Sequence, residues 1–380
     1  MTEIVDDRPS RSVWLETKCI AGEAEQVAAL VAAEVEEGGC AAVVCSSVGL
    51  AQERFEVIRA RLPETEVLLL HGRIRPLERG PIERRLTDAL GPESIDRPRR
   101  MVVVATQVIE QSLDIDFDVM LSDLAPIDLL IQRAGRVHRH ERPERPARHS
   151  EPRLVVLDAK GQPQEVLRAL ERPVEQIYVP AVSHRTRLAL RGLDRLVEPD
   201  DLDRLINAVY GEDVDDRATE TERTAIAELD SKAEEQRRSR TDWANSGVIG
   251  ATHDPFAPWE TQRAALADGD EPGQTARDAA VTRWSERPSI SVVVLTEDEA
   301  ARLGSSVDTN AVREILRRSV SISDPRITST LLAAQGDYRP DEWRRSGALR
   351  RQFRVVVGPS CELPLTWDEI YGVVIKERTA

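Results

Sequence analysis

A short arginine-rich stretch, residues 132–140 (QRAGRVHRH), carries side chains suited to phosphoryl-transfer chemistry. Four of its residues follow the spacing QxxGRxxR, namely Gln132, Gly135, Arg136 and Arg139. On a helix, this spacing places the glutamine and both arginines on one side, and the glycine lets another backbone come close. Each guanidinium offers fixed donors and keeps its proton, which suits the spread charge of a phosphoryl group in transit. The stretch therefore predicts two arginine fingers, Arg136 and Arg139.

The elements around this stretch indicate a sheet of parallel strands. Short apolar runs without in-and-out alternation, as in strands buried on both faces, span residues 12–20, 41–45, 66–70, 101–105, 117–121 and 153–158. Between them, residues 24–35 and 51–62 have helical period and are followed by Gly38-Gly39 and Pro63, which end helices. The alternation predicts an α/β fold with a doubly wound parallel sheet. In such sheets, ligands meet the loops at the C-terminal ends of the strands.

The rest of the chain extends this domain into a predicted arrangement of four parts. These are a disordered N-terminus (1–12), the sheet domain (13–160), a helical and partly disordered linker (161–280) and a small α+β C-terminal domain (281–380). The clearest helices of the linker lie at residues 202–213 and 221–240. The second of these is highly charged, which is typical of a solvated spacer. Residues 241–280 are rich in Gly, Asp, Pro and Thr, and we expect them to be irregular.

Composition favours a soluble globular protein of 380 residues, with 41% hydrophobic and 31% charged residues. No run approaches the roughly 20 apolar residues of a membrane span, so we expect a cytoplasmic protein with no membrane partner. The formal net charge of −15 disfavours a protein coated by nucleic acid, because phosphate binding usually comes from a basic surface. A binding groove needs only local positive charge, and arginines cluster at residues 73–85, 97–100 and 133–148.

The sequence gives no support for a bound metal. The cysteines form no CxxC pair; they are Cys19, Cys40, Cys45 and Cys361. Four aspartates near the arginine-rich stretch have no spacing typical of cation ligands; they are Asp116, Asp118, Asp123 and Asp128. We predict that these aspartates are surface acids or partners of arginines.

The ordered set of motifs from Val102 to His140 resembles the last two motifs of superfamily 2 helicases. It reads VVVATQVIEQSLDIDFDVMLSDLAPIDLLIQRAGRVHRH, with a strand, a polar turn, a second strand, an acidic loop and the cationic stretch in order. This order outweighs the alternative of a solvated basic helix at a domain edge. Within the superfamily, the sequence of these motifs is similar to that of the CRISPR-associated helicase-nuclease of type I systems, which the Cascade complex recruits to unwind and degrade invading DNA.

The resemblance continues on both sides of this region, from about Val13 to Val374. Upstream it includes AAVVCSSVGLAQERFEVI (41–58) and LLHGRIRPLERGPIERRL (69–86). Downstream it is weaker and includes YVPAVSHRTRLAL, LINAVYGED, AVTRWSERPSISVVVL and LTWDEIYGVV. It implies that residues 13–160 are the second RecA-like domain of a helicase and that residues 281–380 are the family's accessory C-terminal domain.

The resemblance also implies roles for individual residues. An acid approaches the nucleotide at Asp114, and Gln132 and Gly135 with both finger arginines complete the ATP site. The track for single-stranded DNA is implied at Ser46, Ser47, His71, Gly72, Arg73, Thr106 and Gln107. Hydroxyls, backbone amides and helix N-termini at strand ends contact phosphates without reading bases. As an alternative, Ser46 and Thr106 are ordinary helix caps.

The chain departs from the family pattern in the motifs that grip ATP and cut DNA. It contains no G-x-x-x-x-G-K-[ST] phosphate loop and no DExH sequence. The His253-Asp254 pair stands alone in a Pro-rich segment, whereas the family's nuclease needs several spaced histidines and aspartates, so we interpret the pair as coincidence. The fingers therefore point at a site that another domain or chain must supply. We expect ATP and Mg²⁺ to bind only in an assembly with that half.

Three hypotheses about function remain open at this point. The first is the C-terminal half of a type I CRISPR helicase, as a split-gene subunit, a truncated remnant or a piece of a longer protein. Its expected partners are the ATP-gripping half, single-stranded DNA and a Cascade-type complex. The second is a catalytically dead module that binds DNA or Cascade, and the third is a fragment of another superfamily 2 helicase.

Overall fold

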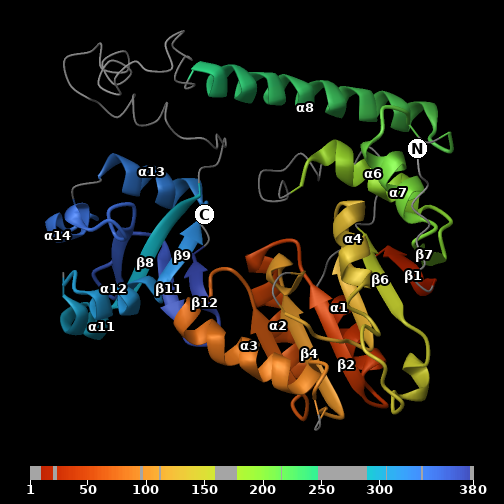
Figure 1. Cartoon of the computed structure of the whole chain (residues 1–380), viewed down its shortest axis with the longest axis horizontal. Helices are drawn as coiled ribbons and strands as arrows, with labels where there is room; N and C mark the ends of the chain where they lie inside the picture. The colour runs from red at the N-terminus through yellow and green to blue at the C-terminus, as the bar shows by residue number, and fades with distance from the viewer. Residues whose placement is uncertain are drawn as a thin grey trace, which may run out of the picture.

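The computed structural model describes residues 10–19, 24–94, 97–110, 113–158, 178–214, 216–246, 289–304, 306–334 and 337–376. These residues form two lobes (Figure 1). The first lobe is built on a seven-stranded sheet with the order β3-β4-β2-β5-β6-β1-β7. Its strands are β1 (Arg11–Cys19), β2 (Gly39–Val44), β3 (Glu66–Leu70), β4 (Arg100–Ala105), β5 (Val119–Asp123), β6 (Arg153–Asp158) and β7 (Arg195–Glu198). All pairings are parallel except that of β7 with β1, which confirms the predicted α/β class.

Helices cover both faces of this sheet, which explains why the strands lack alternation. They are α1 (Ala24–Glu34), α2 (Val48–Arg61), α3 (Pro76–Leu90) and α4 (Ile127–Ala134), with short 3₁₀ turns at Gln107–Glu110 and Ala147–His149. One core packs α1 and α2 onto one face through Val27, Val31 and Phe55. A second core packs α3 and α4 onto the other face through Leu86 and Leu130. Every residue of β2 is buried, so the continuous apolar run is the pattern of a strand with two covered faces.

The described part of the predicted linker belongs to the first lobe. Its helices are α6 (Pro180–Leu190), α7 (Leu202–Tyr210) and α8 (Glu220–Ser246). Leu190, Leu205 and Val209 join the same core as α3 and α4, and β7 extends the sheet beyond residue 160. Helix α8 lies above the first lobe at its N-terminal end and reaches toward the second (Figure 1). The segment predicted to be irregular lies mostly outside the described residues, as does the His253-Asp254 pair.

The second lobe has the small mixed architecture predicted for the C-terminal domain. A three-stranded sheet has the order β10-β8-β9, and β11 and β12 form a separate antiparallel pair. The strands are β8 (Ile290–Thr296), β9 (Ser319–Ile322), β10 (Phe353–Val357), β11 (Leu365–Asp368) and β12 (Gly372–Ile375). The helices are α11 (Glu297–Leu303), α12 (Thr309–Leu316), α13 (Pro325–Ala333) and α14 (Asp341–Arg345).

The two lobes meet at the loop between β3 and α3. The Arg73 carbonyl accepts a hydrogen bond from the Val373 amide at 2.9 Å. Gly372 has φ +65°, and a Cβ there would lie 2.6 Å from the Arg73 carbonyl oxygen, so this close approach needs glycine. The Arg75 side chain is 1% exposed and donates to the Val294 carbonyl at 3.0 Å and to Glu299 at 2.7 Å. The loop is therefore part of a buried contact between lobes.

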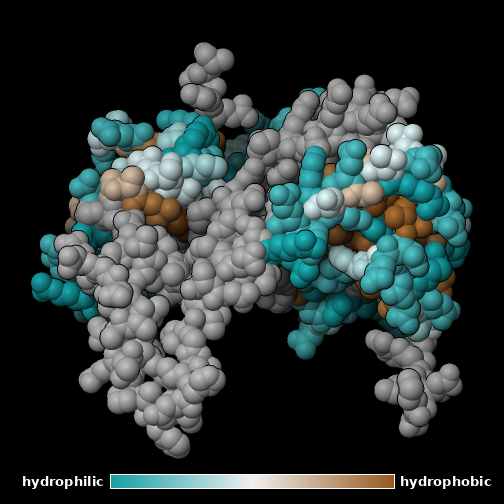
Figure 2. Space-filling model, turned by 90° about the horizontal axis from the view of Figure 1, so that it is seen from above, coloured by the Kyte–Doolittle hydropathy of each residue, from teal (hydrophilic) through white to brown (hydrophobic). Residues whose placement is uncertain are grey.

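Hydrophilic residues cover most of the described surface seen from above, and hydrophobic residues gather in hollows of each lobe (Figure 2). Among the described residues, no helix combines the length and the apolar character needed to cross a membrane.

We expect Arg75→Met to destabilise the protein by about 3 kcal/mol, because it removes one partner from a buried ion-pair network. Urea unfolding would measure the change. Arg317→Ala is a control, because its side chain is 52% exposed on the second lobe and, among the described residues, forms an ion pair with Glu314 in the preceding helical turn rather than across the lobes. If both variants unfold within about 0.5 kcal/mol of the parent chain, Arg75 does not hold the lobes together.

Candidate functional site

The predicted site residues separate into two groups at opposite edges of the large sheet. One group follows the C-terminal ends of β2, β3 and β4; it comprises Ser46, Ser47, His71, Gly72, Arg73, Thr106 and Gln107. The other group lies near the N-terminal end of β5, because α4 runs back along the sheet. Val137 pairs with Phe117, just before β5, and the Phe117 amide donates to the Arg136 carbonyl at 3.0 Å. The expectation that ligands meet the C-terminal strand ends therefore does not fit the arginine fingers.

Helix α4 ends at Ala134, so the prediction that Arg136 and Arg139 lie on its surface is wrong. At the end of the helix, the Arg11 guanidinium donates to the carbonyls of Ala134, at 2.9 Å, and Val137. The chain then turns through His138, which has φ +50°. Both arginines consequently stand on a turn whose shape depends on contacts from other segments.

Gly135 caps α4, and its surroundings differ from the prediction. A Cβ at this position would lie 3.3 Å from the Gln132 carbonyl oxygen and 4.0 Å from the Arg11 guanidinium. The close neighbours are therefore its own helical turn and a side chain, rather than another backbone. Gln132 is exposed on the last turn of α4, and its predicted contact with a nucleotide stays a prediction.

The Arg136 guanidinium is held by backbone carbonyls. It donates to the Glu110 carbonyl at 2.7 Å and to the Leu113 carbonyl. In the part of the chain that the structure describes, no carboxylate forms an ion pair with it. Burial lowers the pKa of Arg136, and the nearby Arg139 lowers it further. A cation held by dipoles beside another cation provides a favourable position for an anionic ligand.

Arg139 has a partner that it can exchange. Its Nε lies 2.5 Å from Asp114 Oδ1, with the two side chains 41% and 55% exposed. The hydrogen bond from Arg139 lowers the pKa of Asp114. An exposed pair of this kind contributes only about 0–1 kcal/mol, so a phosphate could replace the carboxylate at little cost. Asp114 thus lies beside a finger candidate, and its predicted contact with a nucleotide stays a prediction.

At the other edge, one predicted DNA contact has a structural use. Ser47 is the N-cap of α2, and its hydroxyl accepts from the Leu50 amide at 3.2 Å. The helix cap is therefore Ser47 rather than Ser46. The Ser46 amide donates to Asp123 at 2.8 Å. Gln107 donates to the Tyr178 hydroxyl at 3.0 Å, so the Ser46 backbone and the Ser47 and Gln107 side chains are fixed next to this edge of the sheet.

The loop after β3 carries a buried histidine, His71, and an arginine, Arg73. His71 is 0% exposed, and its Nδ1 accepts from the Arg73 amide at 3.1 Å. Burial, together with Arg73, lowers the pKa of His71 to about 3. In this conformation His71 shapes the loop from inside. Gly72 has open space where a Cβ would stand, and among the described residues no carboxylate pairs with the Arg73 guanidinium.

Thr106 is 4% exposed, and its amide donates to the Leu70 carbonyl at 3.1 Å. This bond joins the ends of β3 and β4, so Thr106 fixes the relative position of the two loops. Its predicted contact with DNA stays a prediction.

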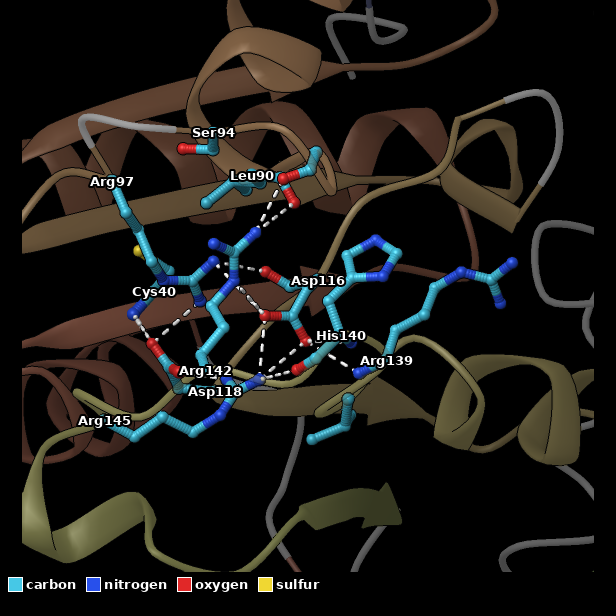
Figure 3. Close-up of polar contacts among 12 residues, drawn as sticks. Cys40, Leu90, Ser94, Arg97, Asp116, Asp118, Arg139, His140, Arg142 and Arg145 are labelled. Carbon is cyan, nitrogen blue, oxygen red and sulfur yellow. Dashed lines mark hydrogen bonds and ion pairs between the residues drawn. The ribbon is translucent and has the colours of Figure 1, made fainter.

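Three of the four aspartates near the fingers are partners of arginines, which agrees with the prediction, and all three are buried. Asp116 and Asp118 are 0% and 1% exposed and lie among Arg97, Arg142 and Arg145 (Figure 3). Asp123 pairs with Arg54 at 2.7 Å. Asp128 accepts instead from the Tyr210 hydroxyl at 2.5 Å. Within the described residues, no group of three or more His, Cys, Asp or Glu side chains is arranged to hold a metal ion.

Sequence reasoning missed Arg11, which it placed in a disordered N-terminus. Arg11 begins β1, and its guanidinium fixes the turn that carries both finger candidates. No local pattern marks this role, because the contact joins residues more than a hundred positions apart.

Several known proteins with similar sequences or structures are described as CRISPR-associated. The family model "CRISPR-associated nuclease/helicase Cas3, C-terminal" matches residues 37–142. The CRISPR-associated endonuclease/helicase Cas3 of Thermus thermophilus is 34% identical over 336 residues, which are 80% of this chain and 35% of that protein. The chain therefore spans about a third of that relative's length.

Two solved structures extend the similarity to nearly all of the chain. One, described as "Crystal structure of CRISPR-associated protein", is 30% identical with a TM-score of 0.79 and covers 99% of this chain and 42% of its own. The other, T. fusca Cas3-ATP, is 25% identical with a TM-score of 0.69 and covers 98% of this chain and 44% of its own.

The buried His71 should make stability depend on pH. Its folded-state pKa of about 3 lies below the ordinary 6.5, so between these values the unfolded chain binds more protons. The stability that the neutral ring contributes is present above about pH 6.5 and is lost as the pH falls, by up to about 1.4 kcal/mol per unit. Urea unfolding at several pH values should show this extra loss in the parent chain and not in His71→Asn, which cannot titrate. A His71 ring that titrates above pH 5 in NMR spectra contradicts the assignment.

Proposed function

This chain corresponds to the C-terminal part of the CRISPR-associated nuclease/helicase Cas3 family, and from that premise we propose that it is the finger-bearing half of an ATP-driven DNA helicase. The observation that carries the proposal is the pair of arginines at the N-terminal edge of the sheet. Among the described residues, no carboxylate forms an ion pair with Arg136, and Arg139 forms a weak, exposed ion pair with Asp114. Both are available to a polyphosphate that another domain presents.

In this proposal, ATP is gripped by the first RecA-like half, and it supplies the phosphoryl group whose hydrolysis drives movement along DNA. The residues of this chain stabilise the charge that develops during transfer. Arg136 and Arg139 offer guanidinium donors, and Asp114 accepts Arg139 when the halves are apart. Among the described residues, no three or more His, Cys, Asp or Glu side chains are grouped to hold a metal ion, and we assign Mg²⁺ to the other half together with ATP.

We assign the C-terminal edge of the sheet to single-stranded DNA. Gly72 leaves space for a phosphate to approach the backbone. Arg73 supplies a cation there that forms no ion pair among the described residues, and Gln107 and Ser46 follow the ends of the neighbouring strands. These groups contact the phosphate backbone rather than base edges, so the track is expected to accept any sequence.

The partners in this proposal are the ATP-gripping half, either as a separate protein or in one polypeptide with this chain, and a Cascade-type surveillance complex. The support for the second partner is the CRISPR-associated description shared by the relatives. A second candidate function is a catalytically dead module that binds DNA or Cascade. It is favoured by the absence of any phosphate-loop sequence from these 380 residues.

The finger assignment predicts the behaviour of a reconstituted ATPase. With the first RecA-like half supplied, Arg136→Ala and Arg139→Ala should each lower kcat about 10³-fold or more, because each removes a donor to the transition state. DNA-stimulated phosphate release would measure the rates. Arg317→Ala is the control, since it removes an exposed arginine of the second lobe. Equal hydrolysis by the parent mixture and by a mixture with both arginines removed would falsify the assignment.

The DNA track predicts a change in salt dependence. Arg73→Ala should weaken binding of single-stranded DNA to the reconstituted protein, and the slope of log K against log salt should become shallower by about 0.7, the value for one phosphate contact. Fluorescence anisotropy at several salt concentrations would measure both effects. An unchanged slope would remove Arg73 from the track. If this chain alone binds as tightly as the reconstituted protein, the binding-module function is favoured over the helicase.

A further inference from the structure

Three hydrogen bonds attach the finger turn to the segment that precedes β5. The Phe117 amide donates to the Arg136 carbonyl at 3.0 Å, and the His138 amide donates to the Phe117 carbonyl at 2.9 Å. The third bond joins the Arg139 amide to Asp116 Oδ1 at 2.7 Å. Two of these bonds use backbone atoms on both sides, so they do not depend on side-chain type. The third depends on a single carboxylate.

Asp116 is fixed by more partners than a surface acid has. Its side chain is fully buried, and its Oδ2 accepts from Arg142 Nε at 2.9 Å and from Arg145 at 2.9 Å (Figure 3). Arg97 lies 3.4 Å from the same oxygen. Arg142 also donates to the Gly91 carbonyl, at 2.6 Å, just beyond the end of α3. The carboxylate is therefore held from several directions, and it cannot move without breaking charged hydrogen bonds.

The neighbouring Asp118 shares two of these arginines but not the finger turn. It accepts from Arg97 at 3.0 Å, from Arg145 at 2.5 Å and from the Cys40 amide at 2.7 Å. Burial raises the pKa of Asp118, but Arg97 and the Cys40 amide act in the opposite direction, and the net pKa is lowered. Asp118 thus provides a comparison with Asp116: similar burial and similar partners, without the bond to the Arg139 amide.

We propose that Asp116 is a positioning residue that fixes the backbone of Arg139 in place. The proposal rests on the finger function given above. The backbone of residues 139–146 forms neither helix nor strand, so no regular hydrogen-bond ladder fixes the Arg139 Cα. The carboxylate of Asp116 holds the Arg139 amide on one side, while Arg142 and Arg145 hold the carboxylate on the other. The long side chain of Arg139 stays free to move between Asp114 and a phosphate.

The isosteric change Asp116→Asn tests this role. Four donors converge on the two carboxylate oxygens, and an amide replaces one acceptor by a donor and removes the charge. Hydrogen exchange measured by NMR on this chain alone should become about tenfold faster or more at the Arg139 amide, because a charged hydrogen bond is weakened. Asp118→Asn is the matched control and should leave that amide unchanged. An Arg139 amide that exchanges equally in the parent chain and Asp116→Asn overturns the proposal.

In the reconstituted ATPase, Asp116→Asn should lower kcat by about 10- to 100-fold, the range expected for a finger displaced by about 1 Å. The KM for ATP should change far less. Combining Asp116→Asn with Arg139→Ala should add little to the loss caused by Arg139→Ala alone, since both changes remove the same interaction. Losses that multiply would show that Asp116 acts through general stability, and the positioning role would be rejected.

The two readouts separate this proposal from the proposed function. If exchange at the Arg139 amide rises but Arg139→Ala leaves ATP hydrolysis intact, the finger function fails, and the positioning role in catalysis fails with it, although the anchor is real. If Asp116→Asn does not fold, Arg142→Gln carries the same test, because it removes one group that holds Asp116 without leaving a buried arginine unpaired. Like Asp116→Asn, this variant should raise the exchange rate of the Arg139 amide and lower kcat. If neither quantity changes, the proposal is overturned.

Discussion

The finger turn depends on a constraint that comes from outside it. Helix α4 ends before the arginines, so the turn has no regular structure of its own. It is fixed on one side by Arg11, which donates to the Ala134 carbonyl at the end of α4, and on the other by hydrogen bonds to Asp116 and Phe117. A helix would tie both arginines to one rigid cylinder. In the turn, hydrogen bonds from other segments fix the backbone, while the exposed Arg139 guanidinium can still change partners.

Electrostatics at this edge favour an incoming anion. Burial lowers the pKa of Arg11 and of Arg136, and the nearby Arg139 opposes the charge of each. Three cations at close quarters raise one another's energy. Among the described ion-pair partners of these three arginines, the exposed carboxylate near the turn is Asp114. Its pair with Arg139 is open to solvent and therefore weak. The buried acids Asp116 and Asp118, by contrast, form ion pairs with Arg142 and Arg145. The ion pairs that hold the structure together are thus buried, and the pair that a ligand could replace is exposed.

The sequence allowed the strands and the finger motif to be predicted because each has a local pattern. Continuous apolar runs indicate strands with two covered faces, and the spacing QxxGRxxR is distinctive by itself. The three- and four-residue spacing of the motif predicts a helix that continues to Arg139, but α4 ends at Ala134, next to Gly135, a residue type that commonly terminates helices. The burial of His71, which is near Tyr371, and the role of Arg11 depend on residues far away in the sequence. A local pattern holds no record of such contacts.

The two edges of the sheet are joined by the short segment after β4. Gln107, at the C-terminal edge, begins a 3₁₀ turn that ends at Glu110. The Glu110 carboxylate pairs with the buried Arg133 at 2.6 Å, and its carbonyl accepts from Arg136 at 2.7 Å. A displacement of this turn would therefore act on α4 and on a finger candidate together. Because protein interiors are close-packed, such a displacement would not be absorbed locally. The same segment that borders the proposed DNA track also supplies the carbonyl that holds Arg136.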